Sequence, residues 1–305
     1  MRTDMHSLSK LSESLSYIYI ERAIVERDNN SLVVIREDDR VPLPVSSLTV
    51  LMLGPGTTVT HAAMCVISQN GCTVEWCGEH GVRFYAIGIG ETHSGERLLK
   101  QAEYHQNPTL HMEVVRRMYK LRFPQMPLEG LDLKALRGIE GIRVRETYKT
   151  LSKIYQVRWY GRDYDLSDMS MGSGINQALS VGNSCLYGLC HSAIVSLGYS
   201  PTLGFIHTGR MLSFVYDIAD LYKMDTIAPA AFEVVGKNFS TDINRDVRIK
   251  CRNMFKDKKL LKRIAKDIAY LFDEYKEQDL DPDTALWDGD NNKIKGGKNF
   301  SGEKE

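Results

Sequence analysis

The hydrophobic pattern near the start of the chain is that of short β-strands separated by polar turns. Runs rich in β-branched, aromatic and aliphatic residues occupy 16–20, 31–35 and 48–53, and polar segments at 28–30 and 36–40 divide them. After these strands, Thr60 is placed to cap a short helix that ends before Gly71, and two further strands follow. This pattern predicts a small, mostly β domain.

From about residue 95 the apolar spacing changes to the three-to-four-residue period of amphipathic helices. Helical spacing begins at Leu98 and resumes after Pro108, a residue that suits the first turn of a helix. The longer predicted helices cover residues of about 132–156, 174–198, 213–236 and 244–276. The fold class is therefore predicted as α+β. A β-rich N-terminal domain at 1–92 is followed by an all-α catalytic domain at 93–278 and a polar tail at 279–305 that we expect to be disordered.

Length and composition agree with two globular domains, because the chain has 305 residues, 43% of them hydrophobic and 26% charged. The longest apolar run, 48–53, is far too short to span a bilayer, and the polar start is not a secretory signal. We therefore expect a cytoplasmic protein with no membrane partner. The six cysteines form no C-x-x-C pair and are expected to be buried, reduced thiols.

A formal net charge of zero hides two blocks of opposite sign. Between Arg245 and Arg263 there are nine Lys or Arg and two acidic residues, whereas Asp273 to Asp290 holds eight acidic residues and one Lys. A solvated helix face is the simplest interpretation of one basic block. A second basic run, Arg116 to Arg122, favours an anionic partner such as nucleic acid instead.

Glu140 stands between Gly138 and Gly141 inside an otherwise helical pattern, and each such glycine costs about 1 kcal/mol relative to alanine. Two of them suggest the close approach of another backbone, helix or ligand. The alternative for Glu140 is a surface ion pair with Arg137 and Arg143, three residues before and after it. Helix geometry alone favours this ion pair.

Three further polar residues stand in apolar surroundings. His207 lies in a glycine-flanked turn, where a lone histidine is more often structural than a ligand. Asp217 and Asp220 are one turn apart in an apolar helix, so their buried charge needs a partner, either a metal ion or Lys223 or Arg210. Carboxylates and an imidazole together suit Mn²⁺ or Mg²⁺ and phosphodiester chemistry. No P-loop or H-E-x-x-H motif suggests another chemistry.

Four segments carry a specific resemblance: LRGIEGIRVRETY, INQALS with SCLYG, GFIHTG and SFVYDIADLYKMDT. From about residue 15 to 275 the chain closely resembles the type I-E form of the CRISPR-associated integrase and endonuclease of the adaptation module, CRISPR-associated protein one. The resemblance implies a β-rich domain followed by a helical catalytic domain. It also implies a homodimer, two copies of which join a dimer of CRISPR-associated protein two in a heterohexamer on double-stranded DNA, both the inserted fragment and the CRISPR repeat.

The resemblance also assigns roles to residues. It implies Glu140, His207 and Asp220 as ligands of Mg²⁺ or Mn²⁺, with Asp217 as a supporting acidic residue of the catalytic site. The positions that it implies for DNA binding are Arg83, Tyr164, Tyr187, Arg245 and Arg248. The chain departs from relatives at three positions: an aromatic residue is usual in place of Arg22, and arginines are usual in place of Thr58 and Cys65. The phosphate contacts that those arginines imply are therefore not expected in this chain.

Three hypotheses follow. The first is a metal-dependent integrase that inserts short foreign DNA fragments into a CRISPR array, with the 3′-hydroxyl of the fragment attacking a phosphodiester. The second is a structure-selective nuclease that uses the same metal site and water. The third is a non-catalytic DNA-binding scaffold, which requires Glu140 and Asp220 to be ordinary ion-pair partners of Arg143 and Lys223.

Overall fold

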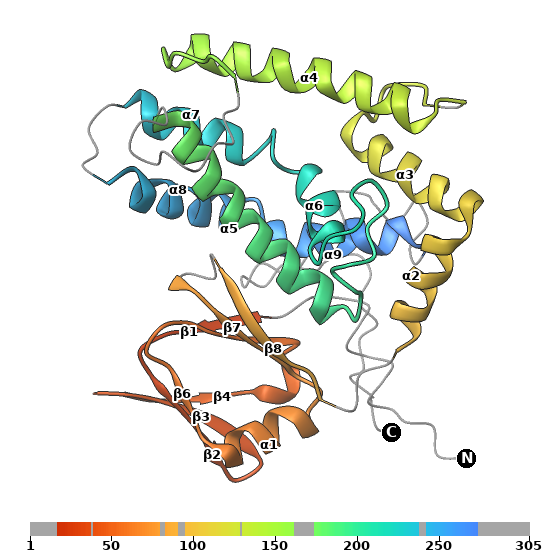
Figure 1. Ribbon diagram of the computed structural model, residues 1–305. Helices are drawn as coiled ribbons and strands as arrows, with labels where there is room; N and C mark the ends of the chain where they lie inside the picture. The colour runs from red at the N-terminus through yellow and green to blue at the C-terminus, as the bar shows by residue number, and fades with distance from the viewer. Residues whose placement is uncertain are drawn as a thin grey trace, which may run out of the picture.

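The computed structural model of the chain has a strand-rich N-terminal part and a helical remainder (Figure 1). It describes residues 17–37, 39–79, 83–90, 95–128, 130–161, 174–237 and 242–273. The predicted α+β class is confirmed, because all eight strands of the described residues lie between 17 and 88 and all their α-helices but one follow residue 95. The predicted domain boundary at 92/93 and the predicted tail at 279–305 lie outside the described residues.

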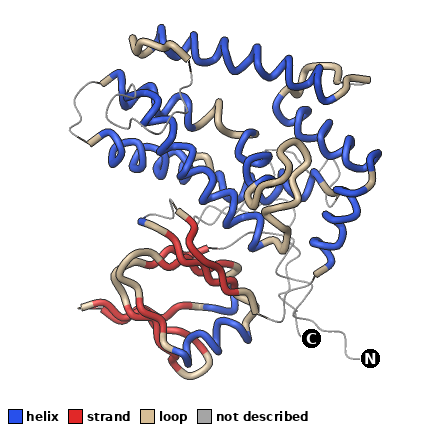
Figure 2. The backbone as a smooth tube through the Cα atoms, viewed as in Figure 1, coloured by secondary structure: helices blue, strands red, loops and turns tan. Residues whose placement is uncertain are grey.

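The N-terminal domain consists of two four-stranded sheets. One has the strand order β1-β5-β7-β8, and the other β4-β3-β2-β6. The strands are β1 (Tyr17–Ile20), β2 (Ile24–Asp28), β3 (Ser31–Arg36), β4 (Asp39–Leu43), β5 (Val50–Leu53), β6 (Thr58–Val59), β7 (Thr73–Cys77) and β8 (Phe84–Gly88). Figure 2 shows the sheets stacked face to face, with α1 (His61–Gln69) against them.

The sequence explains this sandwich. All four residues of β5 are buried, as expected for a strand with parallel neighbours on both sides. Pro42 lies in β4, an edge strand, where a missing backbone N–H is tolerated. The Thr60 hydroxyl accepts a hydrogen bond from the N–H of Ala63 and caps α1 as predicted.

The helical domain is built around α5 (Gly174–Ser196), which packs against most of the other helices and rests on β7 and β8 (Figure 1). By length and composition α5 is apolar enough to cross a membrane, but 61% of its most apolar window is buried, as in the core helix of a globular protein. The remaining helices are α2 (Glu96–Gln106), α3 (Pro108–Arg122), α4 (Leu133–Ile154), α6 (Ser213–Asp220), α7 (Ile227–Gly236), α8 (Ile243–Asp257) and α9 (Leu260–Leu271).

Two predicted helices are wrong in their continuity. The helix expected at 213–236 is two helices, α6 and α7, joined by a turn at 221–226. The helix expected at 244–276 is also two, α8 and α9, because Lys259 adopts a left-handed conformation with φ of 47°. The apolar spacing continues through both interruptions, so the pattern alone predicts longer helices.

The two domains meet where β7 and β8 lie against α5. The Ser196 hydroxyl of α5 donates a hydrogen bond of 3.3 Å to the Glu75 carboxylate of β7, and the rings of Phe84 and His191 stack at 3.7 Å. Glu75 is fully buried, and its second oxygen, Oε2, has no hydrogen-bond partner among the residues that the structure describes. Burial raises the pKa of Glu75 to about 7, against the lowering effect of the Ser192 and Ser196 hydroxyls.

Candidate active site

Asp217 organises the connection between α5 and α6. Its carboxylate accepts backbone N–H bonds from Phe205 at 2.5 Å, Ile206 at 3.0 Å and His207 at 2.8 Å. The Asp217 side chain is fully buried, so these donors replace the water that a charged group loses on burial. The predicted supporting residue thus shapes the turn that carries His207.

Asp217 also orients the His207 ring, since the Asp217 Oδ1 atom lies 2.7 Å from Nδ1. A carboxylate only accepts, so we assign the proton of the neutral ring to Nδ1, which leaves the Nε2 lone pair free. Nε2 faces Asp220 Oδ2 at 3.9 Å. The hydrogen bond to Asp217 raises the pKa of His207, while burial of the ring opposes this change.

Asp220 forms an ion pair with Lys223, one turn further along the chain. Its Oδ1 atom lies 2.6 Å from Lys223 Nζ, and this ammonium stands over the Tyr187 ring at 4.8 Å from the centroid. Burial by itself favours the neutral amine, but the attraction of Asp220 outweighs it and raises the pKa of Lys223. Lys223 is therefore the cation partner that the helix pattern offered as an alternative to a metal ion.

Glu140 is held by side chains from α3. Its Oε1 atom pairs with the Arg122 guanidinium, and its Oε2 atom accepts a hydrogen bond of 3.0 Å from the Tyr119 hydroxyl. The expected partners were Arg137 and Arg143, three residues away on the same helix, and this expectation is wrong. Both turn to backbone carbonyls instead, Arg137 to that of Ile206 and Arg143 to that of Arg122.

The three predicted metal ligands come from α4, the 201–212 connection and α6, and these elements meet. Arg137 of α4 bonds to the residue before His207, and Arg122 donates both to Glu140 and, at 3.4 Å, to the carbonyl of Asp217. Within the described residues no three His, Cys, Asp or Glu side chains already form a metal cluster. The three-ligand set stays a prediction.

The donor chemistry fits a hard divalent ion. Two atoms bound to one ion at about 2.1 Å each lie about 3 to 4 Å apart, and the 3.9 Å between His207 Nε2 and Asp220 Oδ2 falls in this range. A histidine whose other ring nitrogen donates to a carboxylate is the usual arrangement of a metal ligand. Glu140 would complete the set with its remaining lone pairs.

The predicted DNA-binding residues are spread over the molecule. Arg83 is exposed just before β8, and Tyr164 lies outside the described residues. Tyr187 of α5 is half-buried, and its ring meets Tyr216 edge-on at 5.0 Å, which in turn meets His207 at 5.9 Å. Tyr187 therefore lies near the predicted ligands, and its role stays a prediction.

The basic block seen in the sequence becomes one face of α8. Arg245, Arg248, Arg252 and Lys256 recur every three or four residues, while Val247 and Cys251 face the core. Three of these four cations are exposed and Arg248 is half-buried. This face presents positive charge to solvent.

Tyr119 and Arg122 are site residues that the sequence pattern did not predict. Arg122 was counted as part of a basic run, yet its side chain is only 3% exposed. A signal was present, because Arg122 continues the i, i+4, i+7 spacing of the buried residues Val115 and Tyr119 on α3. A cation on a buried stripe needs a buried acidic partner.

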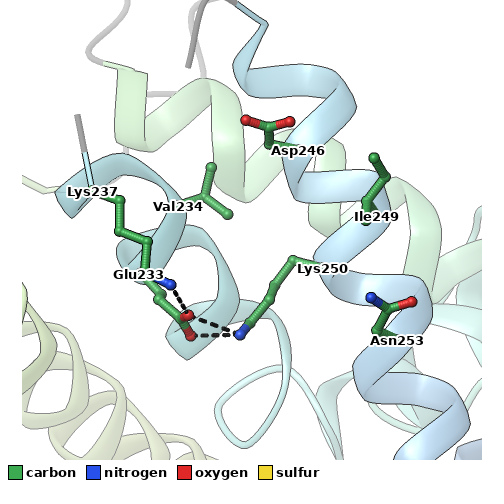
Figure 3. Close-up of a pocket in the computed structure, with 7 residues that line it drawn as sticks. All are labelled: Glu233, Val234, Lys237, Asp246, Ile249, Lys250 and Asn253. Atoms are coloured by element: carbon green, nitrogen blue, oxygen red, sulfur yellow. Dashed lines mark hydrogen bonds and ion pairs between the residues drawn. The ribbon is translucent and has the colours of Figure 1, made fainter. Parts of the chain in front are cut away.

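A groove of about 360 Å³ lies elsewhere, between α7 and α8 (Figure 3). Glu233 is its charged centre and is bonded by Lys237 at 2.7 Å and Lys250 at 2.8 Å, as the dashed lines show. These hydrogen bonds lower the pKa of Glu233. None of the predicted ligands lines this groove, so it is separate from the candidate active site.

Comparison with known proteins decides the family. The family profile of CRISPR associated protein Cas1 matches residues 16–128 and 122–266. The chain belongs to this Cas1 family. It is 44% identical to CRISPR-associated endonuclease Cas1 2 of Thermus thermophilus, over 98% of this chain and 94% of that protein. It is 42% identical to CRISPR-associated endonuclease Cas1 of Escherichia coli K12, over 83% of each.

Solved Cas1 structures share the fold. The TtCas1–DNA complex superimposes with a TM-score of 0.79 at 50% identity, over 85% of this chain and 96% of that one. A casposase bound to an integration product has a TM-score of 0.59 at 13% identity, which shows a common fold and no more. The family match spans the strand-rich domain, the helices that carry Glu140 and Asp220, and the connection that carries His207.

Proposed function

We propose that the chain is a metal-dependent DNA integrase of the Cas1 family in which the 3′-hydroxyl of a short DNA fragment attacks a phosphodiester of a CRISPR repeat. The new bond to phosphorus forms as the bond to the 3′-oxygen of the repeat strand breaks, and that oxygen leaves as a hydroxyl. The observation that carries the proposal is the orientation of His207, whose Nε2 lone pair faces Asp220 while Asp217 holds Nδ1. A histidine with one ring nitrogen bonded to a carboxylate and the other turned to a second carboxylate is typical of a metal ligand rather than of a structural residue.

Each side chain has a part in this chemistry. Glu140, His207 and Asp220 would hold a Mg²⁺ or Mn²⁺ ion, and Asp217 keeps His207 in the tautomer that can bind it. When bound, the ion supplies Lewis-acid polarisation of the phosphodiester and lowers the pKa of the attacking hydroxyl. Lys223 lies beside Asp220 and balances part of the negative charge of the ligand set.

DNA would bind along cationic surface of the helical domain. The Arg245, Arg248, Arg252 and Lys256 face of α8 offers phosphate contacts, and Arg83 adds another on the N-terminal domain. The TtCas1–DNA complex supports DNA as the substrate. The proposed assembly is a heterohexamer in which a dimer of CRISPR-associated protein two bridges two homodimers of this chain, an inference from family membership.

Two alternatives are distinguishable by their products. A nuclease would use the same site with water and release shortened strands. A non-catalytic scaffold would need Glu140 and Asp220 to be ion-pair partners of Arg143 and Lys223. The Lys223 pair exists, and Glu140 pairs with Arg122 in place of Arg143, so product analysis has to separate the scaffold from the integrase.

A strand-transfer assay with the partner protein tests the proposal. Labelled fragment and repeat DNA are incubated with Mg²⁺ or Mn²⁺, with and without EDTA, for wild type and His207→Ala. We expect joined strands from wild type only, and none with EDTA. Shortened strands alone would indicate the nuclease. DNA binding unaffected by EDTA, with no product of either kind, would indicate the scaffold.

A further inference from the structure

The N-terminal half of α4, which carries Glu140, is poorly fixed by packing. Leu136 is the only buried residue between Leu133 and Leu151 on this helix. A Cβ placed at Gly138 would meet nothing within 4 Å, and one at Gly141 would meet only the Arg145 side chain, at 3.9 Å. The close approach that these glycines suggested is therefore absent among the described residues. Something other than close packing must set the orientation of Glu140.

Polar contacts from α3 provide that fixation. The Tyr119 hydroxyl and the Arg122 guanidinium each take one oxygen of Glu140, so the carboxylate is held at both ends. The Arg143 guanidinium reaches back from α4 to the Arg122 carbonyl and joins the two helices a second time. A carboxylate bonded through both oxygens has lost its freedom to rotate about its last bond.

The two α3 side chains are themselves buried. Tyr119 is fully buried, and the Arg122 guanidinium lies over its ring at 5.0 Å from the centroid. Arg122 also bonds to the carbonyl of Asp217, the residue that shapes the His207 turn. One guanidinium thus links Glu140 to the element that carries the other predicted ligands.

We propose that Tyr119 and Arg122 are positioning residues that orient the Glu140 carboxylate toward His207 and Asp220, an inference that rests on the proposed function. Each Glu140 oxygen keeps a lone pair beyond the one that accepts from α3, so the clamp is compatible with metal binding. Hydrogen-bond partners of metal ligands typically contribute a factor of 10 to 100 in metal affinity. Tyr119 is the cleaner of the two to test, because its removal changes no charge.

The experiment measures Mn²⁺ binding by electron paramagnetic resonance of the free ion, in wild type and Tyr119→Phe. We expect the variant to bind Mn²⁺ about tenfold more weakly. Strand transfer by this variant should regain the wild-type rate when Mn²⁺ is raised to saturation, which loss of folding would not allow. Tyr104→Phe is the matched control, since Tyr104 also donates to a carboxylate, that of Asp273 at 3.1 Å, and should leave the affinity unchanged.

The outcomes separate the clamp from the function on which it rests. Wild-type affinity in Tyr119→Phe would overturn the clamp alone, and so would an equal loss in Tyr104→Phe. Absence of Mn²⁺ binding by wild type would overturn the proposed metal site and the clamp together. If Tyr119→Phe does not fold, Arg122→Lys carries the same test, because lysine keeps the charge without the forked donors, and it too should bind Mn²⁺ more weakly.

Discussion

Two fully buried carboxylates, Asp217 and Glu75, occupy opposite kinds of environment. Asp217 receives three backbone N–H groups and the His207 imidazole, so each of its oxygens has partners. Glu75 receives hydroxyl donors from α5 and keeps one oxygen without a partner. Four donors thus surround the first carboxylate, whereas burial raises the pKa of the second to about 7.

The two carboxyl groups differ in what they do for the structure. At the 201–212 connection the Asp217 carboxylate orders a turn and selects the tautomer of His207. At the domain interface the Glu75 carboxyl, with its pKa near 7, contacts only neutral hydroxyls. Ionisation of this group therefore adds little to the stability of the interface. Burial of a carboxylate therefore does not by itself mark a functional site, but the number and kind of its donors does.

The largest expected effect is that of Asp217→Ala. The change leaves three backbone N–H groups and the His207 ring without their acceptor, so we expect a loss of about 3–5 kcal/mol in the free energy of unfolding. Denaturant unfolding measures it. Asp225→Ala is the control, since its ion pair with Arg143 is exposed and its loss should cost at most about 1 kcal/mol. An equal loss of unfolding free energy in the two variants would show that the donors around Asp217 do not make it more important for stability than an exposed carboxylate.

Glu75→Gln tests the other half of the comparison. Because burial raises the pKa of Glu75 from 4.5 to about 7, the folded protein keeps a proton that the unfolded chain releases between these values. The free energy of unfolding of wild type should therefore fall as the pH rises from about 4.5 through 7, by roughly 3 kcal/mol in all.

The variant lacks this titration, so the difference between Glu75→Gln and wild type should grow in favour of the variant from pH 5 to pH 8. Urea unfolding at both pH values gives the two differences. Parallel stability curves for the two proteins would show that Glu75 is charged in both states, and the contrast with Asp217 would then fail.

The sequence predicted the periodic parts of this fold well. The α+β order, the Thr60 cap and the first turn at Pro108 depend on local chemistry, and each is present. Helices α8 and α9 were merged because the break at Lys259 is a single left-handed residue in a continuous amphipathic pattern. Local pattern carries no signal for such a break.

The candidate site was predicted less completely, because its partners are distant in sequence. Asp217 and His207 are ten residues apart and their pairing follows from one turn, whereas Glu140 meets Tyr119 and Arg122 across 21 and 18 residues from another helix. Helix spacing suggested Arg137 and Arg143 for Glu140, and the polar contacts that Tyr119 and Arg122 make from α3 replace them. Contacts between helices are decided by tertiary structure.

Gln101→Ala should have a smaller effect than the carboxylate variants. The Gln101 amide is fully buried and bonds to the Ser200 N–H and to the carbonyls of Ser200 and Leu203, at the start of the connection that Asp217 orders. Loss of these neutral bonds should cost about 2 kcal/mol, measured by denaturant unfolding. A cost as large as that of Asp217→Ala would show that neutral donors anchor this connection as strongly as the buried charge.

Lys237→Ala should have the smallest effect. Lys237 is an exposed partner of Glu233 in the groove of Figure 3, where Lys250 already bonds to the same carboxylate. Exposed pairs contribute little because solvent screens them. We expect an unchanged midpoint of thermal unfolding by circular dichroism. A clear decrease would mean that the fold depends on each of the two lysines that bond to Glu233.

The central claim is that Glu140, His207 and Asp220 bind one divalent ion. Crystals grown with Mn²⁺ and measured at the manganese absorption edge test it directly, because anomalous scattering locates the ion without reference to the protein. The account predicts one peak within about 2.0–2.3 Å of His207 Nε2 and of one oxygen from each of Glu140 and Asp220. A peak bound elsewhere, or bound by Asp220 and His207 with Glu140 still turned to Arg122 alone, would contradict it.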